Sequence, residues 1–125
     1  MVAMLHALDH VTLRSTDLAR TLRFYQRLLG LEPGPRPDLG IPGGWLHVGG
    51  RPVLHVLESP PEGGSGVIDH VAFEARNRAV LTARLDVAAV PHRLAALPDG
   101  SALQMFLSDP DGARIELVFR RPEDR

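Results

Sequence analysis

One six-residue phrase occurs twice in this chain, 60 residues apart in a total of 125. Leu8–Leu13 reads LDHVTL, and Ile68–Phe73 reads IDHVAF. A phrase repeated at a fixed spacing is typical of a duplicated structural unit. We therefore expect two copies of one motif, each placing a histidine, His10 or His70, at the same point of a strand.

The first half has the pattern of a strand, a helix and further strands. Alternating polarity over residues 5–14 predicts a strand, and the apolar spacing from Leu18 to Leu29 predicts a helix that ends at Gly30. Residues 33–44 predict a loop with room for a short strand. Two apolar runs, 45–48 and 52–58, then predict a hairpin.

The second half repeats this order. Its predicted elements are a strand at 67–74, a helix capped by Asn77 and stopped by Val90-Pro91, a strand near 92–97, and a hairpin of 102–107 with 114–119 turning at 109–112. We therefore predict an α+β fold of two βαβββ modules, about 5–58 and 67–120, with a linker at 59–66. Together they form a single domain over residues 1–125.

Composition excludes several classes of protein. The net charge of -1 provides no basic field for nucleic acid, and the absence of cysteine excludes disulfides and thiolate metal sites. No apolar run approaches the ~20 residues of a membrane span, and the first residues do not have the pattern of a signal peptide. We expect a cytoplasmic protein that binds neither nucleic acid nor membrane.

A second internal match identifies candidate metal ligands. Residues 51–57 align with 112–118 at an offset of 61, which places His55 where the second half has Glu116. Together with His10 and His70, these residues give two potential ligands per half. Alternation places Glu116 on the strand face opposite Ile115, Leu117 and Phe119, which should pack on a helix.

Buried imidazole and carboxylate groups lose hydration, and a divalent cation compensates for that loss by taking their lone pairs. A set of three or four His and Glu ligands fits zinc, iron, manganese, nickel or cobalt. We predict a metal site formed by His10, His55, His70 and Glu116. A hydrogen-bonding pocket wall or a proton shuttle beside the metal is the alternative role for His55.

These features together resemble the vicinal oxygen chelate superfamily. The resemblance rests on the paired Asp-His-Val phrases, the helix at 21–31, and the ending Asp109–Gly112 followed by Ile115-Glu116-Leu117. The superfamily includes glyoxalase I, methylmalonyl-CoA epimerase, fosfomycin-resistance enzymes, extradiol dioxygenases and bleomycin-binding proteins. The resemblance implies a cup-shaped mixed β-sheet with helices on its outer face, often in a homodimer.

The resemblance also implies a site. The family's first-strand histidines fall on His10 and His70, and its last-strand glutamate falls on Glu116. Glyoxalase-type members have a carboxylate or amide ligand where this chain has His55, so the chain departs from glyoxalase I there. The metal in such proteins binds two neighbouring oxygens of a small substrate and stabilises an oxyanion or enolate.

The leading functional hypothesis is therefore a metal-dependent glyoxalase-like lyase, isomerase or transferase. Glu116 and His55 are the candidates for moving a proton. Thr12, His47 and Trp45 are the candidates for binding substrate.

Two other functions stay open at this point. Two histidines and a glutamate also suit iron(II), which would make the chain a dioxygenase-like oxidoreductase. A non-catalytic drug-binding resistance protein is the third reading, which the filled ligand positions and the aromatic content of 5% disfavour.

Overall fold

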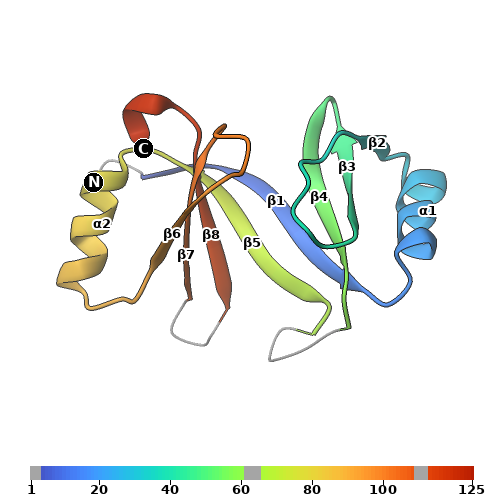
Figure 1. Ribbon diagram of the computed structural model, residues 1–125, viewed down its shortest axis with the longest axis horizontal. Helices are drawn as coiled ribbons and strands as arrows, with labels where there is room; N and C mark the ends of the chain where they lie inside the picture. The colour runs from blue at the N-terminus through green and yellow to red at the C-terminus, as the bar shows by residue number, and fades with distance from the viewer. Residues whose placement is uncertain (1–3, 61–65, 109–112) are drawn as a thin grey trace. The chain divides into compact units, whose positions relative to one another are not determined.

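The computed structural model describes residues 4–60, 66–108 and 113–125 (Figure 1). Most of the predicted linker and the predicted turn at 109–112 lie outside these residues. In chain order the elements are β1 (Leu5–Ser15), α1 (Leu18–Leu29), β2 (Glu32–Gly34), β3 (Gly43–Val48), β4 (Arg51–Glu58), β5 (Ile68–Ala75), α2 (Arg78–Val87), β6 (Arg93–Ala96), β7 (Leu103–Ser108), β8 (Arg114–Phe119) and a short 3-10 helix (Pro122–Asp124). The predicted α+β class and the doubled βαβββ order are confirmed.

The chain forms two compact units. One comprises residues 10–70, and the other comprises residues 1–9 with 71–125. Strands β1 and β5 are therefore each divided between the two units, β1 after Asp9 and β5 after His70. No helix in the described part of the chain is long and apolar enough to cross a membrane.

In the unit of residues 10–70 the strand order is β2-β3-β4-β1. β1 runs parallel to β4, and the other neighbours are antiparallel. Helix α1 follows β1 because Asp17 accepts a hydrogen bond from the Arg20 amide at its start, and it ends where Gly30 adopts a left-handed conformation with φ of 74°. The predicted loop contains the three-residue strand β2 at its start.

The two faces of this sheet differ in chemistry. Thr12, His55 and Trp45 occupy one cross-strand row, so their side chains share a face. The next row includes Gly44, and it faces α1 (Figure 1). A Cβ at Gly44 would lie 2.9 Å from Leu22 Cδ1, so Leu22 of α1 packs directly on the glycine backbone. The helix therefore covers the face opposite the histidines.

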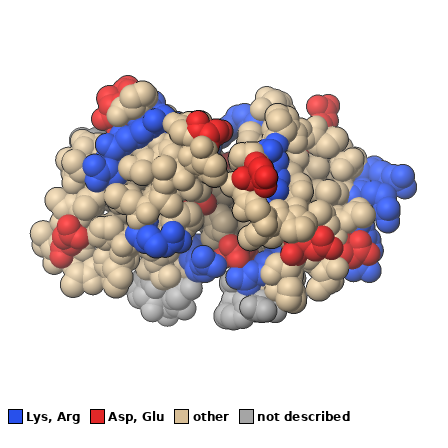
Figure 2. Space-filling view, in the orientation of Figure 1, with Lys and Arg blue, Asp and Glu red and all other residues tan. Residues whose placement is uncertain are grey.

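The outer surface of α1 combines basic and apolar side chains. Figure 2 shows basic side chains gathered at the position of α1, whose exposed arginines are Arg20, Arg23 and Arg27. Leu28 and Leu29 are 70% and 59% exposed. The apolar spacing that predicts the helix therefore includes two residues that the chain itself does not bury.

In the second unit the strand order is β5-β8-β7-β6, with β5 parallel to β8. One face packs on α2, whose Leu81 and Leu85 contact a core of Ala75, Met105, Leu117 and Phe119. Glu116 lies in the row of Ala72 and Phe106, on the opposite face. The predicted division of the last strand into an apolar face and a face with Glu116 is confirmed.

Candidate metal centre

His10 and His70 lie side by side within the unit of residues 10–70. Their Nε2 atoms are 3.2 Å apart, and their rings are nearly perpendicular at 84°. Two nitrogens that each bind one ion at about 2.0–2.1 Å are separated by about 2.8–3.0 Å in octahedral geometry and by about 3.3–3.4 Å in tetrahedral geometry. The spacing of the two Nε2 atoms is therefore that of neighbouring ligands on one metal ion.

Asp69 fixes which nitrogen of His70 carries the proton. The Nδ1–H of His70 donates to Asp69 Oδ2 across 2.6 Å, so the neutral ring has its lone pair on Nε2. The Thr12 hydroxyl lies 3.0 Å from that Nε2 and can donate to it. A carboxylate behind a histidine is the arrangement that orients metal-binding imidazoles in proteins.

Arg14 in turn holds Asp69. Its guanidinium lies 2.7 Å from Asp69 Oδ1, and the two side chains are only 13% and 10% exposed. Because both oxygens of Asp69 receive donors, the carboxylate has little freedom to rotate away from His70. Strand alternation places Asp69 on the face opposite His70, so the hydrogen bond between these two side chains could not be predicted from the polarity pattern. The sequence feature that could have indicated it is the aspartate that directly precedes each of the two repeated histidines.

Asp9, the repeat counterpart of Asp69, has a different partner. It accepts hydrogen bonds from Arg120, in the unit that contains residues 1–9. Burial lowers the pKa of Arg120. The hydrogen bond and the charge of Asp9, together with the charges of Glu74 and Glu116, raise this pKa by a larger amount, so the net shift is upward. The two copies of the phrase are thus anchored by different arginines.

His55 is held between two rings. It stacks on His10 with centroids 3.7 Å apart and on Trp45 with centroids 3.9 Å apart, at interplanar angles of 15° and 9°. Its Nε2 donates to the Pro52 carbonyl across 3.2 Å, so the lone pair of the neutral ring is on Nδ1. A ligating nitrogen points its lone pair within the ring plane, and the lone pairs of two parallel stacked rings do not converge on one ion.

The candidate substrate contacts differ in their surroundings. Thr12 is 2% exposed and contacts His70, whereas Trp45 is half-buried against His55. His47 packs on β2, because a Cβ at Gly34 would lie 2.2 Å from its Nε2. That Nε2 is buried without a hydrogen-bond partner among the described residues. Thr12 therefore contacts one of the paired imidazoles directly.

Glu116 belongs to the other unit, on β8. Its side chain is 4% exposed although it is acidic, and its cross-strand neighbours are Ala72 and Phe106. A carboxylate removed from water needs a compensating partner, and the positive charge of Arg120 interacts with the Glu116 carboxylate. The burial predicted for Glu116 is therefore observed.

Comparison with known proteins defines the class. The Glyoxalase/Bleomycin resistance protein/Dioxygenase superfamily matches residues 7–117. The chain belongs to this superfamily. Among curated proteins, the chain is 29% identical over 123 residues to Glyoxylase I 4 of Arabidopsis thaliana. The alignment covers 90% of this chain and 70% of that protein.

Solved structures share the fold. Methylmalonyl-CoA epimerase from Mycobacterium tuberculosis aligns with a TM-score of 0.72 at 22% identity, covering 98% of this chain and 95% of that one. The Mn(II)-bound glyoxalase from Novosphingobium aromaticivorans aligns with a TM-score of 0.74 at 20% identity. That alignment covers 95% of this chain but only 40% of the larger glyoxalase.

Proposed function

We propose that this protein is a metal-dependent glyoxalase-like enzyme whose divalent ion is held by His10, His70 and Glu116. The observation that carries the proposal is the pair of Nε2 atoms 3.2 Å apart, one of them oriented by Asp69. Two imidazoles and a carboxylate suit zinc, manganese, iron, nickel or cobalt. When bound, such an ion acts as a Lewis acid on the adjacent oxygens of a small substrate.

We propose that His55 transfers the proton and is not one of the metal ligands. Its Nε2–H is engaged by the Pro52 carbonyl, and the stack between Trp45 and His10 holds the ring in place. The neutral ring therefore presents Nδ1 as a base for a proton next to a substrate carbonyl. Returning that proton at the same or a neighbouring carbon gives an isomerase or epimerase reaction. Glu116 remains the alternative proton carrier if it does not bind the ion.

Thr12 is the proposed contact to a substrate oxygen. Its hydroxyl is 3.0 Å from His70 Nε2, so it lies beside the proposed ion position. Trp45 and His47, both on β3, are proposed to form the wall of the substrate site farther from the ion. A homodimer and a cytoplasmic location stay predictions. The exposed side chains of Phe24, Leu28 and Leu29 on α1 support a contact with another protein surface.

The test is turnover of small 2-oxo and 2-hydroxy carbonyl compounds, monitored by exchange of the α-proton with D₂O by NMR. The proposal expects exchange that disappears after chelation and returns with one of the five metals. Exchange that is indifferent to chelation would contradict it. Metal-dependent oxygen uptake without proton exchange would instead favour the dioxygenase-like reading, for which two histidines and a glutamate are also suited.

A further inference from the structure

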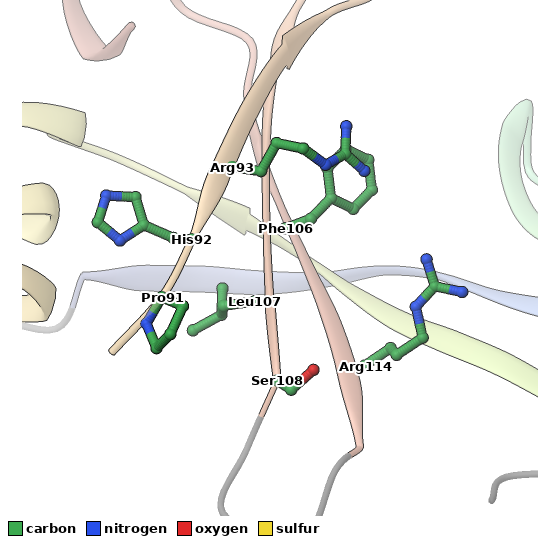
Figure 3. A pocket seen from close by; sticks show the side chains of 7 residues that line it. All are labelled: Pro91, His92, Arg93, Phe106, Leu107, Ser108 and Arg114. Carbon is green, nitrogen blue, oxygen red and sulfur yellow. The ribbon is translucent and has the colours of Figure 1, made fainter. Parts of the chain in front are cut away.

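A pocket of about 560 Å³ opens at one end of strands β6, β7 and β8 (Figure 3). All of its lining residues belong to the unit that contains residues 71–125. The lining residues are Pro91, His92, Arg93, Phe106, Leu107, Ser108 and Arg114. Its volume is within the range of sites that bind small organic molecules.

The chemistry of the pocket is cationic and aromatic. The Arg93 guanidinium lies 4.6 Å from the centre of the Phe106 ring, and Figure 3 shows it over that ring. Arg114 extends from β8, and Ser108 adds a hydroxyl beside it. Among the described residues that line the pocket, two are arginines and none is an aspartate or a glutamate. This combination favours a ligand with negative charge.

The stack on Phe106 makes Arg93 suitable for binding. A free arginine side chain samples many conformations and loses that freedom when it binds a ligand. The cation–π contact with Phe106 restricts the guanidinium before any ligand arrives. The exposed part of the ring can also contact a flat portion of the ligand.

The pocket shares a sheet face with Glu116. Arg93 is paired with Phe106 across β6 and β7, and Phe106 is paired with Glu116 across β7 and β8. Arg114 precedes Glu116 by two residues on β8 and therefore points to the same side. A ligand in the pocket would lie along the row that ends in the proposed metal-binding carboxylate.

We propose that this pocket binds the anionic group, a carboxylate or a phosphate, of the enzyme's small substrate. Arg93 and Arg114 provide the charge-assisted hydrogen bonds, and Phe106 contacts the part of the substrate next to the anion. The substrate class is thereby narrowed to small acids that carry neighbouring oxygens. This role in catalysis rests on the proposed function, whereas the binding of anions by the pocket does not.

The test measures binding of malonate and of inorganic phosphate by calorimetry to the full-length chain, both as purified and after chelation. Chelation removes direct binding of the anion to a metal ion, so the remaining affinity belongs to the pocket. Arg93→Gln and Arg114→Gln should each raise the Kd of the better probe at least tenfold in the chelated protein. Raising the salt concentration should weaken binding as well. The matched control is Arg51→Gln, an exposed arginine on β4 in the other unit, which should leave the Kd unchanged.

Several outcomes would overturn the proposal. These are the absence of measurable binding of either anion, equal binding of the uncharged malonamide, or binding that both pocket variants retain. Unfolding curves of each variant show whether a lost affinity reflects a lost fold. Because the decisive arm is free of metal, a failed metal site would leave this result intact. Conversely, a failed pocket would leave the metal proposal standing.

Discussion

Asp69 accepts a hydrogen bond from His70 Nδ1 across 2.6 Å, and this contact determines the chemistry of the opposite ring nitrogen. With the proton held on Nδ1, the Nε2 lone pair of the neutral ring faces Thr12 and His10. The carboxylate itself is held by Arg14. A three-residue chain therefore orients a lone pair before any ion is bound.

Asp69→Asn is expected to lower metal affinity by about 10- to 100-fold, because a neutral amide orients the imidazole less strongly and makes it less basic. Competition against a fluorescent chelator measures this directly. Asp99→Asn is the matched control, since Asp99 is an exposed turn residue that accepts from the Ser101 amide. Equal affinity of the Asp69 variant and the wild type would show that Asp69 does not orient the ligand.

Arg14→Gln is expected to destabilise the fold by up to about 3 kcal/mol, because it leaves the largely buried Asp69 carboxylate without its ion-pair partner. Urea unfolding measures the loss. Arg51→Gln replaces an exposed arginine at the start of β4 and should change the stability by less than about 1 kcal/mol. Similar losses in the two variants would contradict a special role for the Arg14–Asp69 pair.

His55→Gln separates the two roles considered for this residue. If His55 carries a proton, the variant keeps its metal and loses about 10²- to 10⁴-fold in kcat. If His55 is a ligand, metal content falls together with activity. The stacking on His10 and Trp45 predicts the first result, and elemental analysis beside a kcat measurement distinguishes them.

Gly43→Ala is expected to cost about 2 kcal/mol of stability through a backbone clash. A Cβ at this position would lie 2.5 Å from the Val56 carbonyl oxygen, which cannot move without disturbing the pairing of β3 with β4. At neighbouring Gly44 the same Cβ would meet the flexible end of Leu22, so Gly44→Ala should cost less. Thermal unfolding of the two variants gives the comparison; a smaller loss at Gly43 would be inconsistent with this packing.

Much of the fold could be predicted because local signals and the repeat agree. Helix α1 ends at Gly30 as its apolar spacing predicts, and the alternation on β8 separates Leu117 from Glu116. The repeated phrase also places His10 and His70 at equivalent positions, and they lie together in the structure. These features depend on spacing along the chain, which a sequence displays directly.

The surroundings of the site could not be predicted in the same way. The stack of Trp45 on His55 depends on the register between β3 and β4, and that hairpin contains an irregularity after Leu46. The contact of Asp69 with His70 joins residues that alternation assigns to opposite faces. Such contacts are set by strand pairing and side-chain rotamers, which polarity patterns do not encode.

The most direct test is the metal content of the purified protein, measured by elemental analysis. The proposed ligand set predicts about one divalent ion per chain. It further predicts that His70→Ala and Glu116→Ala lose that ion while remaining folded. Full metal content in both variants would contradict the proposed site.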